Sequence, residues 1–245
     1  MAISYWQDMS ILVGGLELAT HGKNVTLATE VAPLDSTAIN TTGWMSFIGG
    51  LKSSKVDMSL MQDVTAGSVD STVFDLLGDA DTPHSICTLS ADGSTAYLFR
   101  GIPLSYTPQE AQVGELATAK LAGQSSTGGV VRGTLIHPGS ASRTSSDVGT
   151  GRQLGAVAAG KSLYAALHVL SVAGTDTPTV TVKVQSDDNS GFTSATDRIT
   201  FTGATAVGAQ WSSVAGAITD DYWRISYTIS GTNPVFAFAV TAGIL

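Results

Sequence analysis

Apolar side chains recur at every second position in several short segments of the second half of the chain. Residues 163–169 and 225–229 alternate in this way, as do residues 180–184, which follow Pro178 at a natural strand start. An alternation of period two predicts strands with one face against a core. Residues 198–202 and 210–217 supply further short strands, and together they favour a β-sandwich of the immunoglobulin-like or jelly-roll type.

One pair of these strands predicts a hairpin. The alternation of 225–229 ends at the turn-forming residues Ser230–Pro234, and the apolar run 235–240 follows directly. Turn residues between two strand-like runs predict that the runs pair in an antiparallel fashion.

The first half of the chain is also rich in predicted strands, and these are longer. They cover residues 23–31, 53–62, 96–102, 109–122 and 129–136. One helix is expected at residues 71–77, where apolar residues recur at helical spacing and Gly78 provides a stop. The expected fold class is therefore all-β with one short helix.

The clearest boundary lies after His137, where residues 139–151 contain almost no large apolar side chain. Such a segment cannot bury enough surface to order itself, which is typical of a linker. We therefore predict a first domain at residues 1–138, a linker at 139–151 and an outer β-sandwich domain at 152–245.

Charge is sparse and unevenly placed. Only 13% of the residues are charged, the net charge is −8, and residues 1–138 hold thirteen acidic and six basic residues. An acidic surface repels phosphates, which excludes tight DNA binding and anionic membranes as partners.

The single cysteine, Cys87, excludes an intramolecular disulfide and is expected in the core. No cationic segment precedes an apolar stretch at the start, and no run of about 18 apolar residues occurs, so synthesis in the cytoplasm without a membrane span is expected.

Residues 155–162 match the phosphate-binding pattern G-x-x-x-x-G-K-[ST]. That motif requires a buried strand before it and a helix after it, yet the segment that follows alternates like a strand. Residues 187–191 begin like a calcium loop, but position 198 is Arg198 where an acidic ligand is needed. We read both segments as turns.

No catalytic, cofactor or metal site is predicted. The four histidines (His21, His84, His137 and His168) are far apart and are expected in turns or on the surface, and residues 79–84 hold only a weak metal-like grouping. A β-rich glycosidase stays open as an alternative, with Trp211, Tyr222 and Trp223 available to stack on sugars, but no acid pair is recognisable.

Two parts of the chain resemble a known family. Residues 220–240 look like the end of the major tail proteins of long-tailed phages and related gene transfer agents. The first half resembles their tube domain, with a strand leading through Glu30 to Leu34 and Asp35, then Thr42-Gly43-Trp44, a long strand at 53–62 and a helix near Phe74. The resemblance implies a tail-tube-type β-barrel or sandwich domain followed by the outer sandwich.

The resemblance also implies a function without catalysis. Six first domains would form a ring, and the rings would stack into a hollow tail tube through which DNA passes without specific binding. Partners would be further copies of the chain and other tail proteins at the tube ends. The protein would be assembled in the host cytoplasm and reside in the virion tail. The alternative is a virion protein that decorates a capsid or binds carbohydrate.

Strand alternation and exposed aromatic residues suggest where such contacts lie. Lys55, Asp57, Ser59 and Asp63 are candidates for the lumen, or for an ordinary solvent-facing sheet. Tyr5, Trp6 and Met9 are candidates for contacts between rings, because such side chains are unusual in water. Trp44 is expected either to anchor a loop or to fill the core.

Overall fold

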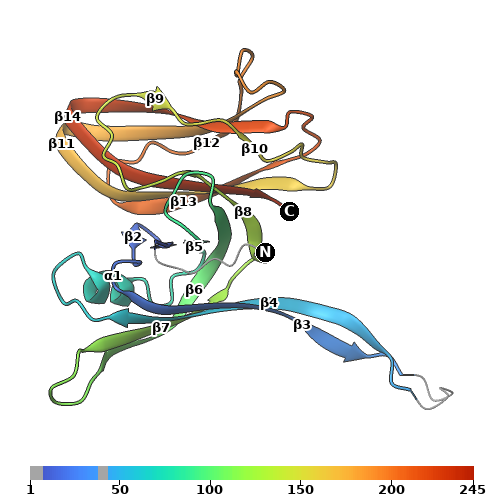
Figure 1. Cartoon of the computed structure of the whole chain (residues 1–245), viewed down its shortest axis with the longest axis vertical. Coiled ribbons are helices and arrows are strands. Elements are labelled where there is room, and N and C mark those ends of the chain that lie inside the picture. Colours follow the sequence, from blue (N-terminus) through green and yellow to red (C-terminus); the bar gives the residue numbers. More distant parts are fainter. Residues whose placement is uncertain (1–7, 38–43) are drawn as a thin grey trace.

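The computed structural model describes residues 8–37 and 44–245. They form one helix, α1 (Val69–Asp75), and fourteen strands. The strands are β1 (Ser10–Val13), β2 (Leu16–Glu17), β3 (Gly22–Asp35), β4 (Phe47–Met61), β5 (Thr82–Cys87), β6 (Thr95–Glu110), β7 (Thr118–Ser125), β8 (Val131–His137), β9 (Asp147–Val148), β10 (Arg152–Gln153), β11 (Ser162–Asp187), β12 (Thr196–Thr200), β13 (Gly208–Ala215) and β14 (Tyr222–Ile244). The expected all-β fold with one short helix is confirmed. Figure 1 shows two lobes, with β1 to β7 and α1 in the lower, β9 to β14 in the upper, and β8 between them.

The first hydrophobic core lies against a sheet with the strand order β3-β4-β7-β6-β5-β1-β2. Val56, Met58 and Leu60 of β4 are all buried in this core, as their alternation predicted. α1 covers part of it with Val69 and Val73. Period-two burial on one face explains why these segments form strands and not helices.

The helix begins and ends two residues earlier than the sequence predicted. Ser68 precedes it in an extended conformation, and its hydroxyl donates a hydrogen bond to Asp63 Oδ2 at 2.6 Å. Val69 then belongs to the buried face. Gly78 adopts a φ of +83°, a left-handed conformation that favours glycine and prevents the helix from continuing.

The second core lies between the halves of two long, bent strands. The first part of β11 pairs with the last part of β14, and the last part of β11 pairs with the first part of β14. Both strands bend at residues in left-handed conformations, Gly174, Asp176 and Thr177 in β11 and Gly231 and Asn233 in β14. The halves face each other across the core, as in a sandwich.

The expected hairpin between residues 225–229 and 235–240 is therefore wrong. The turn-forming residues at 230–234 are present, but they bend β14 and do not reverse it, because both halves of β14 find their partner in β11. The predicted burial is nevertheless correct, since Leu163, Leu167 and Val182 have no exposed surface.

A second correction concerns the expected strand at residues 109–122. β6 continues to Glu110, residues 111–117 form a turn, and β7 begins at Thr118. Gly114 adopts a φ of +93° in this turn, which explains why the chain reverses there.

β8 connects the two lobes. One edge of β8 pairs with β6, with Thr95 opposite Thr134, and the other edge pairs with β14, with Ala242 also opposite Thr134. Two small hydrophobic clusters contain residues from both lobes, such as Leu98 with Ala166. The lobes are thus joined by hydrogen bonds and by packing.

Gly133 and Gly243 face each other where β8 meets β14. A Cβ at Gly243 would lie 2.8 Å from Gly133 Cα, and a Cβ at Gly133 would clash with the carbonyl of Ala242. We expect Gly133→Ala to lower the free energy of unfolding by roughly 3 kcal/mol, because backbone cannot yield as a side chain can. Gly129→Ala is the matched control, since no atom lies within 4 Å of its added Cβ. Urea unfolding measures the free energy of unfolding of both variants. Equal values would contradict the close approach of β8 and β14.

Residues 139–151, expected as an unpaired linker, follow β14 for part of their length. Arg143 exchanges two backbone hydrogen bonds with Phe236, β9 pairs with Ser226 and Tyr227, and Gly149 N donates to Ile225 O at 2.9 Å. The order of this segment thus comes from backbone pairing and not from apolar burial. The division into two domains stays a prediction.

Three histidines lie on interior strands, so the expectation that they lie in turns or on the surface is wrong. His84, His137 and His168 are at most 4% exposed. His168 Nδ1 donates to Gly14 O at 2.7 Å, and its Nε2 lies 2.9 Å from the hydroxyl of Ser85. These partners are more than 80 residues away in the sequence, which explains why the local pattern did not reveal them.

Candidate assembly interface

Besides the outer edge of the two-residue strand β2, two longer strand edges of the first sheet have no strand partner within the described residues. β3 pairs with β4 alone along its 14 residues. Residues 103–110 of β6 have no strand partner besides β7, although Pro103 O accepts a hydrogen bond from Gly78 N and Pro108 O accepts one from Gln62 Nε2. Unpaired edges are templates for another strand. Both carry prolines, Pro33 in β3 and Pro103 and Pro108 in β6, which suits edge positions in a lone subunit.

The sheet curls around the first core without closing on itself. A cavity of about 460 Å³ opens between β3 and the strands on the far side of the core, and Val25, Leu27, Ile86, Tyr97 and Val130 contribute its apolar lining. A closed barrel would bring its edge strands together. Across residues 8–37 and 44–138, the first half of the chain is therefore not a self-contained barrel.

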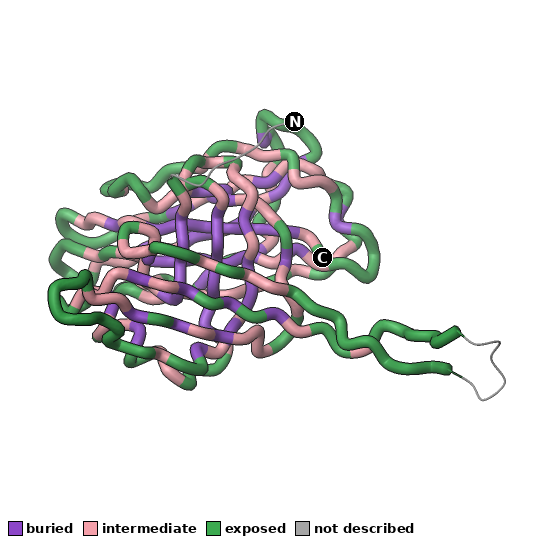
Figure 2. The backbone as a smooth tube through the Cα atoms, turned by 60° about the horizontal axis from the view of Figure 1, so that its bottom comes forward, coloured by how far each residue is buried: buried purple, intermediate pink, exposed green. Residues whose placement is uncertain are grey.

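The ends of β3 and β4 project far beyond the body of the molecule (Figures 1 and 2). We call residues 31–37 and 44–52 the arm. Its large apolar side chains are about half or more exposed, and Trp44 and Leu51 are 85% and 87% exposed. The exposed set is Val31, Leu34, Trp44, Met45, Phe47, Ile48 and Leu51. An isolated two-stranded hairpin is marginal in water, so a surface of this kind marks a site of protein contact.

Sequence reasoning missed most of the arm. The expectation that Trp44 fills the core is wrong because its side chain lies in solvent. A usable signal was present in Trp44–Ile48, where four of five residues are apolar without the alternation that a half-buried strand requires.

Three of the four lumen candidates lie on the polar face of the first sheet. Lys55 and Asp57 are exposed and Ser59 is half-buried. Across the register they stand beside small or polar residues, since Asp57 lies opposite Thr26 and Ala122. This face is separate from the core.

Asp63 is placed differently, beyond the end of β4. Its carboxylate accepts hydrogen bonds from Ser68 Oγ at 2.6 Å and from Thr65 N at 2.9 Å, and His21 Nε2 lies 3.3 Å away. The hydrogen bond from Ser68 is the main reason that the pKa of Asp63 is held well below its usual range. The arrangement fixes the loop that leads into α1.

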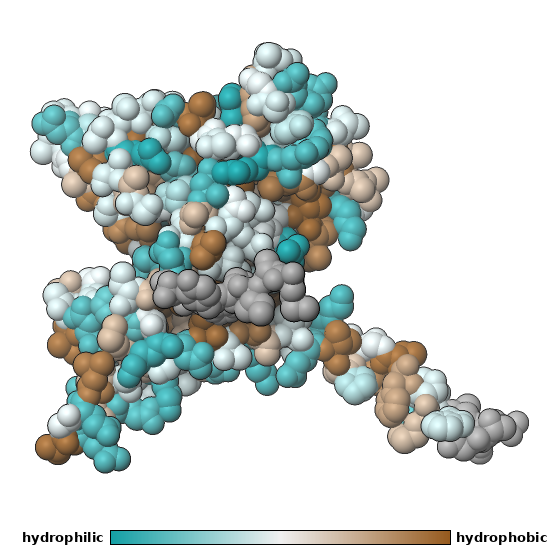
Figure 3. Space-filling view, viewed as in Figure 1, coloured by the Kyte–Doolittle hydropathy of each residue, from teal (hydrophilic) through white to brown (hydrophobic). Residues whose placement is uncertain are grey.

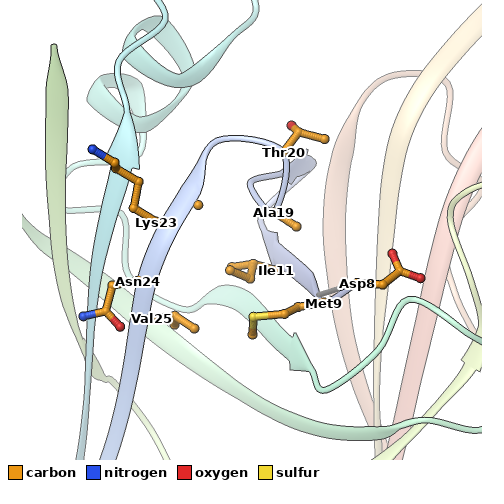
Figure 4. A pocket seen from close by; sticks show the side chains of 9 residues that line it. Asp8, Met9, Ile11, Ala19, Thr20, Lys23, Asn24 and Val25 are labelled. Carbon is orange, nitrogen blue, oxygen red and sulfur yellow. The ribbon is translucent and has the colours of Figure 1, made fainter. Parts of the chain in front are cut away.

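The candidates for contact between rings fall largely outside the described residues. Tyr5 and Trp6 lie in the part that is not described. Met9 is half-buried and lies in a cavity of about 420 Å³ with Ile11 and Val25 (Figure 4). Part of its side chain packs against the first core, and its role between rings stays a prediction.

The segments that match a phosphate-binding pattern (155–162) and the start of a calcium loop (187–191) form turns beside strands. In residues 155–162, Gly160 adopts a φ of +79° and strand β11 follows at once, with no helix. Asp187 accepts backbone hydrogen bonds from Asn189 and Ser194, as in a turn. Within residues 8–37 and 44–245 no cluster of three metal-ligating side chains occurs, and no helix is long and apolar enough to cross a membrane.

Of the three aromatic residues of the glycosidase alternative, Trp223 is buried, and Trp211 and Tyr222 are half-buried. Trp223 is fully buried, and its Nε1 donates to Gly155 O at 2.9 Å. Trp211 is half-buried and packs against Tyr164, with ring centroids 5.9 Å apart. A buried indole cannot stack on a ligand.

No family model and no curated protein matches the chain. Among solved structures, a chain of a native gene transfer agent virion is 14% identical with a TM-score of 0.41, covering 52% of this chain and 97% of that one. A chain of the extended sheath-tube complex of an extracellular contractile injection system is 11% identical with a TM-score of 0.42, covering 55% and 93%. The Dit protein of phage SPP1, a hub adsorption protein, is 11% identical with a TM-score of 0.37, covering 98% and 100%. At these identities and TM-scores the likeness assigns no role to any residue of this chain.

Proposed function

We propose that this chain is a structural subunit of a phage-type tail, and that its first sheet joins neighbouring copies in hexameric rings that stack into a hollow tube. DNA passes through this tube without specific binding. Other tail proteins contact the tube ends, and assembly takes place in the host cytoplasm. Residues 152–245 form the outer domain.

The open sheet carries the proposal. The sheet β3-β4-β7-β6 has one free edge on β3, and residues 103–110 of β6 form a second edge with no strand partner beyond β7 among the described residues. Two different edges on one subunit favour a head-to-tail contact, in which β3 of one copy pairs with β6 of the next. Such contacts form a ring when the rotation closes, and the ring pairs the β3 and β6 edges of every subunit.

The polar face of this sheet is the proposed lumen wall. Lys55, Asp57 and Ser59 lie on it, and Lys120 on β7 forms an ion pair with Glu110 at 2.6 Å. A wall with few uncompensated cations does not hold DNA, because its phosphates find little positive charge. Tyr5 and Trp6 are proposed to add contacts between rings.

Negative-stain electron microscopy of the purified chain at high concentration tests the proposal. Six-fold rings or hollow tubes are expected, and light scattering should give the mass of at least six copies. Single particles of one uniform small mass at all concentrations would overturn the proposal and favour a decorating protein.

A further inference from the structure

The core-facing side of the first sheet changes from apolar to polar at one level. Leu27 of β3 and Val56 of β4 lie opposite each other, and both contact the first core. Two residues further along the same face, Thr29 lies opposite Ser54. Ser54 N donates a hydrogen bond to Ser125 Oγ of β7 at 3.2 Å, so the change runs across three strands. The apolar interior of the sheet thus ends on a row of hydroxyl groups.

Two cavities meet at this row. The apolar cavity of about 460 Å³ described above is lined in part by Thr29 and Val130. The same two residues line a second cavity, of about 570 Å³, at the root of the arm. The surface is hollowed between the upper lobe and the arm (Figure 3). The lining of the second cavity is mostly small and polar, and includes Lys52, Ser54, Ser125, Gly128 and Gly129. The two cavities therefore adjoin, one apolar and one polar.

Positive charge lies beside both cavities. Arg132 lines the apolar cavity and Lys52 lines the polar one, and both side chains are exposed. Neither forms an ion pair with another described residue. Glu30 follows Thr29 on β3 and therefore points to the opposite face of the sheet. Leu245 also lines the polar cavity, and its backbone oxygen accepts a hydrogen bond from Ser162 N at 3.0 Å. Two cations are thus available to one anionic group.

Uncharged hydrogen-bond donors complete the polar cavity. Ser125 Oγ accepts the bond from Ser54 N, so its own hydrogen remains free to donate. The backbone N–H groups of Gly128 and Gly129 have no backbone acceptor within residues 8–37 and 44–245. Ammonium, guanidinium, hydroxyl and backbone N–H groups are the donors that hold carboxylates in proteins.

We propose that the two cavities together bind a fatty acid, with its alkyl chain in the apolar cavity and its carboxylate within reach of Lys52 and Arg132. Sites for small ligands have volumes of roughly 300–1,000 Å³ and combine an apolar lining with a few placed polar groups. A planar guanidinium can hold a carboxylate through two parallel hydrogen bonds. This site goes beyond the proposed function. Its lining residues belong to one subunit, so binding does not require rings, and a failure of ring formation leaves it untouched.

Isothermal titration calorimetry with hexanoate, octanoate and decanoate, each below the concentration at which it forms micelles, tests the site. One ligand per subunit is expected. The affinity should rise roughly fourfold for each added methylene, because each one leaves water for the apolar cavity. Decanol, which has the same chain without the carboxylate, should bind about tenfold more weakly than decanoate.

Three variants assign the binding to these residues. Lys52→Gln combined with Arg132→Gln should remove the preference for decanoate over decanol and keep the dependence on chain length. Both side chains are exposed, so the fold should persist. Val130→Phe narrows the apolar cavity and should weaken binding of the whole series. Lys55→Gln is the matched control, because Lys55 lies on the opposite face of β4 from Lys52.

Three results would overturn the proposal. They are no binding of decanoate, equal affinities for hexanoate and decanoate, and a Lys55→Gln variant that behaves like the double variant. A site that a neighbouring copy already fills would bind decanoate only when the subunits are dissociated. Titrations at protein concentrations below and above assembly detect this, and that result would also overturn the proposal.

Discussion

A chain in which an Asn-Gly turn replaces residues 32–51 is expected to fold normally and to form no tubes. Val31 and Lys52 lie directly opposite each other in the register of β3 and β4, so a two-residue turn joins them without strain. The deletion removes the exposed apolar surface of the arm from Leu34 to Leu51. Electron microscopy should then show rings that do not stack.

Stability provides the control for this deletion. Exposed residues contribute little to the fold, so the free energy of unfolding should change by no more than about 0.5 kcal/mol. Thermal unfolding of the shortened and full chains measures this. Tubes of normal length from the shortened chain would show that the arm is not needed, and a large loss of stability would show that the arm belongs to the fold.

Acid is expected to destabilise the protein from about pH 6.5 downward, before most of its carboxylates titrate. Burial lowers the pKa of His84, His137 and His168 to about 4, against an ordinary value of 6.5. Between these pH values the unfolded chain takes up protons that the folded chain does not. Stability is therefore fully present above pH 6.5 and is lost as the pH falls toward 4.

The expected loss of stability in acid is large compared with the total free energy of unfolding. Each of the three histidines contributes a loss of roughly 3 kcal/mol at pH 4, and a protein of this kind is stable by only about 5–15 kcal/mol. Glu17 acts in the opposite direction, because burial raises its pKa and favours folding in acid. One carboxyl offsets only part of the loss from three imidazoles.

Urea unfolding between pH 7 and pH 4 measures the acid effect. His168→Gln should flatten the dependence on pH, because the amide keeps hydrogen-bonding capacity without titrating in this range. His21→Gln is the control, since His21 is half-buried near Asp63 and lies outside the interior that holds the other three histidines. Stability that stays constant from pH 6.5 to pH 4 would mean that the interior histidines are accessible to protons in the folded state.

Local alternation predicted which residues are buried but not how the strands connect. Val56 to Leu60 and Leu163 to Val169 lie in cores as expected, because facing a core requires only a period of two. Turn residues at 230–234 mark a change of direction in either a hairpin or a bend. The choice depends on β11, which lies more than 40 residues away.

The same limit explains the missed arm and histidines. A place in the core was one of two expectations for Trp44, because sequence patterns record whether a residue is apolar and not what covers it. His168 is neutral and buried because Gly14 and Ser85 satisfy both ring nitrogens, and these partners are found only after folding. A contact with another molecule or with a distant segment cannot be predicted from the residues on either side of a position.

The shared strand β8 has a mechanical consequence. A force that pulls on the upper lobe enters β14 and passes through its hydrogen bonds to β8, and from β8 to β6. Strands loaded along their length resist in shear, so several bonds must break at once before the lobe can detach. We therefore expect the upper lobe to move together with the sheet beneath it. A force on the surface of the upper lobe is transmitted through β8 to that sheet.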